Sequence, residues 1–299
     1  MFKNVIFYRF NHNEWKMSAQ QVEAALEKAR FHPCGATQPK SIGWVEPRGQ
    51  DHGPLVEVVQ GQMILKFFTE TKKVPGSAIK DEVEKRVKKI EHETGRKPGR
   101  KEIKDLKEEV VLSLLPKAFT SKASTFVWLD RENGYLIVDA SSQSKCDDII
   151  TSMVNQLNLS VSLIQTETSP QAAMSEWLLS SDYPGNFDGD RSCDLQAIDE
   201  SKSTVKYARH DLAIEEIRDH IKKGLLPVKL TMSWNSKITF ALTYAMQLKK
   251  IELADVDVDE KPADGQEDRF DTDVAIMTGE LSQLLPELLE ALGGEMEVQ

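Results

Sequence analysis

The chain has 299 residues, of which 40% are hydrophobic and 29% are charged, and its formal net charge at pH 7 is −10. This length allows two or three subdomains with buried cores, and no apolar run approaches the roughly 20 residues that span a bilayer. The N-terminal residues MFKNVIFYRFNHNEW lack the long apolar core of a signal peptide, so we expect a cytoplasmic protein without a membrane partner. The widely spaced cysteines predict buried thiols rather than a disulfide framework or a zinc ribbon: Cys34, Cys146 and Cys193.

The charges are unevenly distributed along the chain. Residues 71–124 hold 15 Lys or Arg against 9 Asp or Glu, residues 199–250 hold 10 against 6, and residues 252–299 hold 2 against 15. Exposed charges more than about 10 Å apart are largely screened at cellular salt, so a polyanion responds to local patches rather than to the net charge. The negative total therefore does not exclude a nucleic-acid partner.

In chain order, the first part alternates strands with helices. Strand patterns occupy residues 2–10, 56–59, 63–68, 125–129 and 135–138, with a short strand at Trp44 and Val45. Ser18 and Gln21 form a predicted capping box for a first helix. Asn133-Gly134 is the strongest hairpin signal in the chain, and residues 149–157 predict an amphipathic helix.

Residues 78–119 predict two amphipathic helices joined by a basic turn. Apolar residues recur at helical spacing at Ile79, Val83, Val87 and Ile90, and again at Ile103, Leu106, Val110 and Leu114. Gly95, Pro98 and Gly99 lie between these runs and predict the end of one helix and the start of the next. Pro116 ends the second helix because it lacks an N–H, and it leaves Phe119 just past that end. The stretch predicts a helical hairpin with a cationic tip.

The second half of the chain repeats this mixture. We expect a short helix at residues 173–178, a loop at 180–192, a strand at 205–208, and a long hairpin at 228–234 and 238–244. Asp211 is the predicted N-cap of a helix that contains Ile217 and Ile221. The acidic residues 255–273 predict a loop, after which Thr278 caps a final helix that ends at Gly293-Gly294.

These elements predict an α+β fold of antiparallel β-hairpins and sheets with interspersed helices and a protruding helical hairpin. We expect four parts. Residues 1–73 and 125–180 form a central α+β domain, residues 74–124 form the helical-hairpin subdomain, and residues 181–299 form a C-terminal α+β base domain.

The basic residues are the first functional candidates, because cations that track a phosphate backbone release its counterions. The predicted DNA-binding set on and after the helical hairpin is Lys88, Lys89, Arg96, Lys97, Arg100, Lys101 and Lys117. A second set comprises Arg209, His210, Lys222 and Lys223, with Lys202 and Lys206 nearby. The alternative is a solvated helical hairpin whose cations pair with its own glutamates.

Two apolar stretches are candidates for a subunit contact. Leu115 and Phe119 lie at the end of the helical hairpin, where a large aromatic side chain could be covered by another subunit. Leu285 and Leu288 belong to the final helix, whose apolar residues extend beyond a narrow stripe. An ordinary core position is the alternative for Phe119, and a core position is the default interpretation for the final helix.

Catalytic and metal-binding patterns are weak. Glu70-Thr71-Lys72, with Asp51 upstream, has the acidic-acidic-Lys pattern by which some nucleases hold Mg²⁺, and Glu102-Ile103-Lys104 repeats part of it. Asp255, Asp257 and Asp259 begin like a calcium loop, but Glu260 and Gln266 stand where Gly and Glu are required. The six histidines have no ligand spacing, and no P-loop, GxGxxG, GxSxG or HExxH motif occurs. We expect no metal and no cofactor.

Six blocks, in order over essentially the whole chain, resemble the bacterial RdgC family of recombination-associated proteins: FKNVIFYRF, FHPCGATQPKSIGWVEP, EVVLSLLPKAF, WLDRENGYLIVDASS, LAIEEIRDHIKKG and RFDTDVAIMTGELSQLLPELLEALGGE. The resemblance implies a non-enzymatic protein of the cytoplasm and nucleoid that binds DNA with little sequence preference. It also implies a ring-shaped homodimer that encircles duplex DNA, also binds single strands, and restrains RecA-promoted recombination.

Two positions match the family in detail. Phe119 in LLPKAF matches the aromatic that closes one subunit contact, and Arg209-His210 occupy a position that the family uses near DNA. This chain has Arg-His where the family resemblance leads us to expect Lys-Gln. The pair is still polar and partly cationic, but the resemblance does not carry over the exact contact at that position. The alternative function is a Mg²⁺-dependent nuclease on a DNA-binding α+β body.

Overall fold

A computed structural model of the protein describes residues 1–254 and 266–296. The strands are β1 (Asn4–Phe10), β2 (Lys40–Val45), β3 (Glu57–Val59), β4 (Gln62–Lys72), β5 (Thr120–Asp130), β6 (Tyr135–Val138), β7 (Val161–Leu163), β8 (Phe187–Ala197), β9 (Thr204–Ala208), β10 (Leu225–Trp234), β11 (Ile238–Thr243) and β12 (Gln247–Leu253). They form one 12-stranded antiparallel sheet in the order β2-β4-β5-β6-β1-β12-β11-β10-β8-β9, with β3 paired to β4 and β7 to β1.

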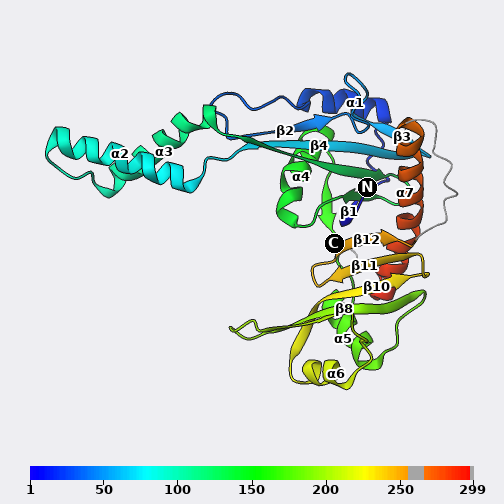
Figure 1. Cartoon of the computed structure of the whole chain (residues 1–299). Coiled ribbons are helices and arrows are strands. Elements are labelled where there is room, and N and C mark those ends of the chain that lie inside the picture. Colours follow the sequence, from blue (N-terminus) through cyan, green and yellow to red (C-terminus); the bar gives the residue numbers. More distant parts are fainter. Residues whose placement is uncertain (255–265, 297–299) are drawn as a thin grey trace.

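The helices surround this sheet and extend from it (Figure 1). They are α1 (Ala19–Leu26), α2 (Gly76–Thr94), α3 (Arg100–Leu114), α4 (Gln143–Leu157), α5 (Pro170–Ser180), α6 (Glu215–Lys222) and α7 (Gln266–Ala291), with short 3-10 helices η1 (Glu27–Ala29) and η2 (Leu115–Lys117). The predicted α+β class with antiparallel hairpins is confirmed. The division of the chain into four parts stays a prediction.

The central strand β1 is buried on both faces. Val5 and Phe7 point into a core that contains the leucines of α7, whereas Ile6 and Tyr8 point into a second core that α1 and α4 cover. The alternation follows from the pleat, which sends successive side chains to opposite faces. Each fully buried side chain of this kind contributes about 1.5–3 kcal/mol, so these two cores hold the middle of the sheet rigid.

Helix α7 contacts strands from both halves of the sheet. Near its start, the Phe270 ring lies 6.5 Å from Phe126 of β5, and the Arg48 guanidinium lies 4.6 Å above Phe270. Near its end, Trp234 of β10 donates its indole N–H to the Glu287 carboxylate at 2.7 Å. The helix therefore fixes the position of β8–β12 relative to β1–β6.

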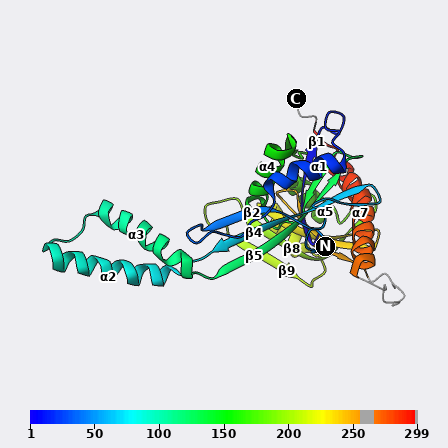
Figure 2. The same cartoon turned by 90° about the horizontal axis from the view of Figure 1, so that it is seen from above.

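The predicted helical hairpin is confirmed as an arm, α2 with α3, that extends away from the rest of the molecule (Figure 2). It is carried by a ribbon in which residues 68–72 of β4 pair with residues 120–124 of β5. Gly95 ends α2 with a φ of +68°, and Glu102 accepts a hydrogen bond from the Gly99 N–H at the start of α3. Leu106 and Val110 are the buried residues of α3.

Several boundaries differ from the sequence predictions. The predicted loop at residues 180–192 is wrong in its second part, because β8 begins at Phe187 and pairs with Trp234. Asp211 does not cap a helix. Its carboxylate accepts from the N–H of Ala213, and α6 begins four residues later at Glu215. Strands β7 and β12 were not predicted, since their residues lack a clear alternation of period two.

The final helix is longer than predicted. It begins at Gln266, so Thr278 lies inside it and donates its hydroxyl to the Val274 carbonyl instead of capping it. The predicted acidic loop is therefore wrong for residues 266–273, and residues 255–265 lie outside the described part of the chain. Among the cysteines, Cys146 and Cys193 are buried as predicted, whereas Cys34 is only half-buried.

Candidate nucleic-acid interface

The arm holds most of the predicted DNA-binding residues, but several of them already have acidic partners. Arg96 forms a two-point ion pair with Glu102, at 2.9 and 3.2 Å, and this pairing lowers the pKa of Glu102. Lys89 lies 3.9 Å from Glu93. The same holds for Lys80, Lys85 and Arg86, which pair with glutamates of the arm. The self-paired surface that composition suggested as an alternative therefore exists along much of α2.

The other predicted cations of the arm are exposed and unpaired. Among the residues that the structure describes, no carboxylate lies within 4.0 Å of Lys88, Lys97, Arg100 or Lys101. Lys97 lies in the turn, and Arg100 and Lys101 open α3. An unpaired cation can contact phosphate without first giving up a partner, so these four are the stronger DNA-binding candidates.

Two further cations on α3 were missed by the sequence analysis. Lys104 and Lys107 are exposed, and neither has an ion pair within the described ranges 1–254 and 266–296. Together with Arg100 they are spaced four and then three residues apart, which places all three on one face of the helix. The sequence contains this signal, because the three cations recur at the same helical spacing as the apolar residues of the same stretch.

Lys117 and Phe119 lie where the arm joins the body. Lys117 ends η2 and is exposed, and Phe119 follows with 93% of its surface exposed. The Phe119 carbonyl accepts from the N–H of Lys73, so the backbone at this junction is held in place while the ring is free.

A groove lies on the same arm, close to this junction. Its volume is about 540 Å³, and its lining residues are Pro39, Lys104, Lys107, Glu108, Val111, Leu112 and Leu115. Leu112 is 52% exposed, whereas Leu115 is 2% exposed. The groove thus offers an apolar floor with lysines at its rim.

Three of the four predicted interface residues belong to the core of the chain. Leu285 and Leu288 have no exposed surface and pack with the side chains of β10 and β11, and Leu115 is almost fully buried. They cannot present a side-chain surface to another subunit, which corrects the expectation for Leu285 and Leu288 and restricts Leu115 to the floor of the groove. Phe119 alone keeps its predicted exposure.

The second basic set lies at the opposite end of the sheet. Arg209 and His210 follow β9 and are exposed, and the His210 N–H donates to the Arg191 carbonyl of β8. On α6, Lys222 pairs with Glu215 at 3.3 Å, while Lys223 is exposed. A hydrogen bond of 2.8 Å between Tyr207 and His220 holds α6 beside β9. The structure therefore groups these four residues in one region, far from the arm along the strand order.

The residues of the nuclease hypothesis are not brought together. Glu70 lies on β4, where it is the strand partner of Ser41 near the start of β2. Asp51 lies beyond the other end of β2, after Val45. Glu70 is 4% exposed and accepts from the N–H of Cys34 at 2.6 Å, and the Lys72 ammonium donates to backbone carbonyls. Within the described part of the chain, no three His, Cys, Asp or Glu side chains gather closely enough to hold a metal ion.

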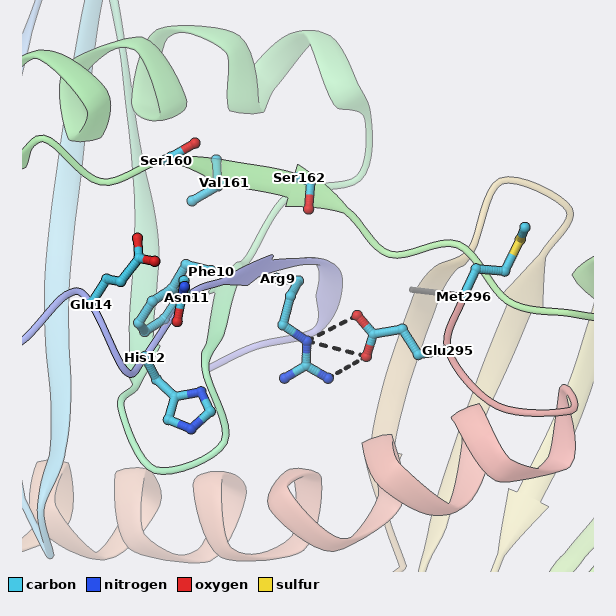
Figure 3. A pocket seen from close by; sticks show the side chains of 10 residues that line it. All are labelled: Arg9, Phe10, Asn11, His12, Glu14, Ser160, Val161, Ser162, Glu295 and Met296. Carbon is cyan, nitrogen blue, oxygen red and sulfur yellow. Dashed lines mark hydrogen bonds and ion pairs between the residues drawn. The ribbon is translucent and has the colours of Figure 1, made fainter. Parts of the chain in front are cut away.

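A pocket of about 630 Å³ lies between β1, β7 and the end of the described chain (Figure 3). Its charged centre is Arg9, which points at Glu295 and forms an ion pair with it. Arg9 also donates to Tyr135 and to the Asn133 carbonyl. Burial alone would lower the pKa of Arg9, but the Glu295 carboxylate raises it overall. With its donors used in this way, Arg9 is a structural residue rather than a ligand-binding one.

Comparison with known proteins gives a consistent result over the whole chain. A family model described as "Putative exonuclease, RdgC" matches residues 1–295. A recombination-associated protein RdgC from Cupriavidus necator is 42% identical over 98% of both chains. Proteins of the same name from Dechloromonas aromatica and Bordetella pertussis are 39% and 35% identical, over 99% of this chain and 98% and 99% of theirs. The described helices include none that is long and apolar enough to cross a membrane. At this identity and coverage, the chain belongs to the RdgC family of recombination-associated proteins.

Proposed function

We propose that this protein is a non-sequence-specific DNA-binding protein that encircles duplex DNA as a homodimeric ring and so restrains RecA-promoted strand exchange. One observation carries the proposal: an otherwise acidic molecule extends an arm on which Lys97, Arg100, Lys104 and Lys107 have no acidic partner among the described residues. We place the protein at the nucleoid, in the cytoplasm, and expect it to bind single strands as well.

The arm suits phosphate contacts better than base readout. Arg100, Lys104 and Lys107 span roughly 10 Å of one helix face, at 1.5 Å per residue. Long flexible cations on one face can follow the sugar-phosphate backbone of any sequence, and each neutralised phosphate releases counterions. The exposed pair Arg209 and His210 adds a second basic surface at the other end of the sheet.

Phe119 and the arm groove support a two-fold subunit contact. The most exposed large apolar side chain on the arm lies four residues after Leu115, which forms the floor of the groove. A two-fold contact needs such a self-complementary surface, in which each subunit supplies both the inserted side chain and its receptor. Phe119 of one subunit would then enter the groove of its partner between Pro39 and Leu112.

We infer that the protein acts without catalysis. Glu70 lies on β4 opposite Ser41 near the start of β2, whereas Asp51 follows the other end of β2, and the Glu70 carboxylate is engaged by Cys34 and Lys122. Restraint of recombination would then follow from occupancy, because a ring on duplex DNA competes with a recombinase filament for the same duplex. The names of the curated relatives support a role in recombination.

Two matched triple variants test the DNA surface. Lys97, Lys104 and Lys107 are unpaired, whereas Lys80, Lys85 and Lys89 lie on the same arm in ion pairs. Replacing either set with Ala removes the same charge. We expect the unpaired set to reduce the magnitude of the slope of log K against log salt by about 0.9 per lost contact on duplex DNA, and the paired set to reduce it by less than half as much. Equal changes in the two variants would remove the unpaired row from the interface.

A further inference from the structure

The second basic surface gathers exposed cations around one histidine. Arg209 and His210 follow β9 and are exposed, and Arg191 of β8 is exposed beside them. Among the residues that the structure describes, no carboxylate lies within 4.0 Å of the charged atoms of these three side chains. The surface therefore presents positive charge without an acidic partner, as the unpaired cations of the arm do.

The backbone holds His210 in a fixed position at the edge of the sheet. Its N–H donates to the Arg191 carbonyl at 3.0 Å, which continues the pairing of β9 with β8. Arg209 precedes it with a φ of +55°, and this left-handed conformation turns the chain out of the strand. The Arg191 guanidinium donates to the Arg209 carbonyl at 3.5 Å. His210 is thus positioned by contacts from both strands.

The tautomer of His210 follows from its own hydrogen bond. Its Nδ1 lies 2.8 Å from the carbonyl oxygen of Asp211. A carbonyl oxygen can only accept, so Nδ1 carries a hydrogen in both the neutral and the protonated ring. Nε2 is then the atom that gains and loses a proton. In the neutral ring Nε2 is an acceptor only, whereas in the protonated ring it is a donor that carries part of a positive charge.

A phosphate oxygen distinguishes these two states of His210. It is a negatively charged acceptor, so it receives a hydrogen bond from a protonated Nε2 and is repelled by the lone pair of a neutral one. Histidine is the residue whose charge ordinarily changes between pH 5 and 8. A phosphate contact at His210 therefore needs the protonated ring, whereas arginine keeps its charge throughout this range.

The other ionisable groups beside His210 do not supply this response. The Asp211 carboxylate accepts a backbone hydrogen bond within the following turn. The Tyr207 ring of β9 lies 6.2 Å from the His210 ring, and burial, with a smaller contribution from Glu216, raises the pKa of Tyr207 above 10.0, so it is neutral from pH 6 to pH 8. On α6, His220 is half-buried and shares a 2.8 Å hydrogen bond with the Tyr207 hydroxyl. Of these groups, His210 is the exposed one that can change charge in this range.

We propose that His210 is a proton-gated phosphate ligand, in which protonation of Nε2 tightens the binding of DNA to the second basic surface. The inference rests on the proposed DNA-binding function and adds its regulation by pH. Because linkage is reciprocal, DNA that favours the protonated ring must also cause proton uptake when it binds near pH 7.

Two substitutions at the same position test the proposal. Affinity for a short linear duplex is measured at pH 6 and pH 8 at one ionic strength. We expect the parent chain to bind at least about fivefold more tightly at pH 6, since hydrogen bonds to charged groups are the stronger ones. His210→Gln should bind equally at both pH values, and His210→Arg should bind at pH 8 as tightly as at pH 6. His92→Gln removes an exposed histidine of the arm and, as the control, should keep the full difference. A difference in His210→Gln as large as that of the parent chain would overturn the proposal.

Calorimetry gives an independent readout. Titrations at pH 7 in two buffers of different ionisation enthalpy should show proton uptake on binding to the parent chain and none on binding to His210→Gln. Uptake that persists in His210→Gln and is lost in His92→Gln would assign the effect to the arm and overturn the proposal. A parent chain whose affinity falls with salt but not with pH would overturn the proton gate alone. Absence of salt-dependent binding at either pH would overturn the proposed DNA-binding function as well, so the two failures are distinguishable.

Discussion

Arg96 and Glu102 face each other across the turn of the arm, with the two guanidinium Nη atoms 2.9 and 3.2 Å from the two carboxylate oxygens. Glu102 also accepts from the N–H of Gly99, so the pair fixes the start of α3. Arg96 therefore has a structural role, and the unpaired cations Lys97, Arg100 and Lys101 next to it are the ones available to phosphate.

Because Arg96 is paired with Glu102 and Lys97 is not, we expect these two adjacent cations to contribute differently to DNA binding. Lys97→Ala should reduce the magnitude of the slope of log K against log salt by about 0.9, the value for one lost phosphate contact, whereas Arg96→Ala should reduce it by less than half of that. Binding titrations on an unrelated-sequence duplex at several salt concentrations give both slopes. Glu102→Gln is the converse variant: it should tighten binding by releasing Arg96. Equal slopes for Lys97→Ala and Arg96→Ala would show that the ion pair opens on DNA.

The exposed Phe119 ring leads to a prediction for assembly. Phe119→Ala should weaken the dimer by at least 30-fold, because truncating a central aromatic side chain of an interface typically costs about 2 kcal/mol or more. Leu112→Asp, in the receptor groove, should have a similar effect without touching Phe119. The matched control is Val154→Ala on α4, also an exposed apolar residue. Sedimentation equilibrium measures all three, and a dimer unaffected by Leu112→Asp would separate the groove from the contact.

Gly43 allows close packing of β2 against the preceding segment. A Cβ atom at this position would lie 2.5 Å from the Cα of Phe31 and 2.8 Å from the Ala29 carbonyl. Gly43→Ala should therefore destabilise the protein by about 1–3 kcal/mol, the usual cost of overpacking. Gly279→Ala is the control, since Gly279 lies inside α7 with open space around it and should gain about 0.5–1 kcal/mol. Urea unfolding midpoints measure both changes.

Glu70 predicts a pH dependence of stability. The Cys34 N–H, followed by smaller contributions that include Lys122, lowers the pKa of Glu70 below its ordinary value of 4.5. The carboxylate therefore stabilises the folded state above pH 4.5, and this contribution is lost as the pH falls through the lower folded-state pKa. Glu70→Gln should be less stable than the parent chain at pH 7, and the difference should shrink below pH 4.5. Unfolding midpoints from pH 7 to pH 3 check this, and a constant difference would contradict it.

The arm shows how far pattern reading reaches. The apolar spacing and the two glycines predicted both helices and their junction, because helical periodicity and glycine conformation are local properties of the chain. The N-terminal capping box and the hairpin around Asn133-Gly134 were predicted for the same reason. At Thr278 and Asp211 the local signal was ambiguous, and the predicted helix caps are wrong. Thr278 is an interior residue of α7, and Asp211 stabilises a turn.

By itself, the sequence determined the α+β class, the basic arm and the family. Only the tertiary structure decided which cations are unpaired, that Phe119 is exposed, that Leu285 and Leu288 belong to the core, and that Asp51 and Glu70 lie apart. The reason is physical. Spacing within one element fixes which side chains share a face, whereas pairing and burial depend on residues far away in the chain.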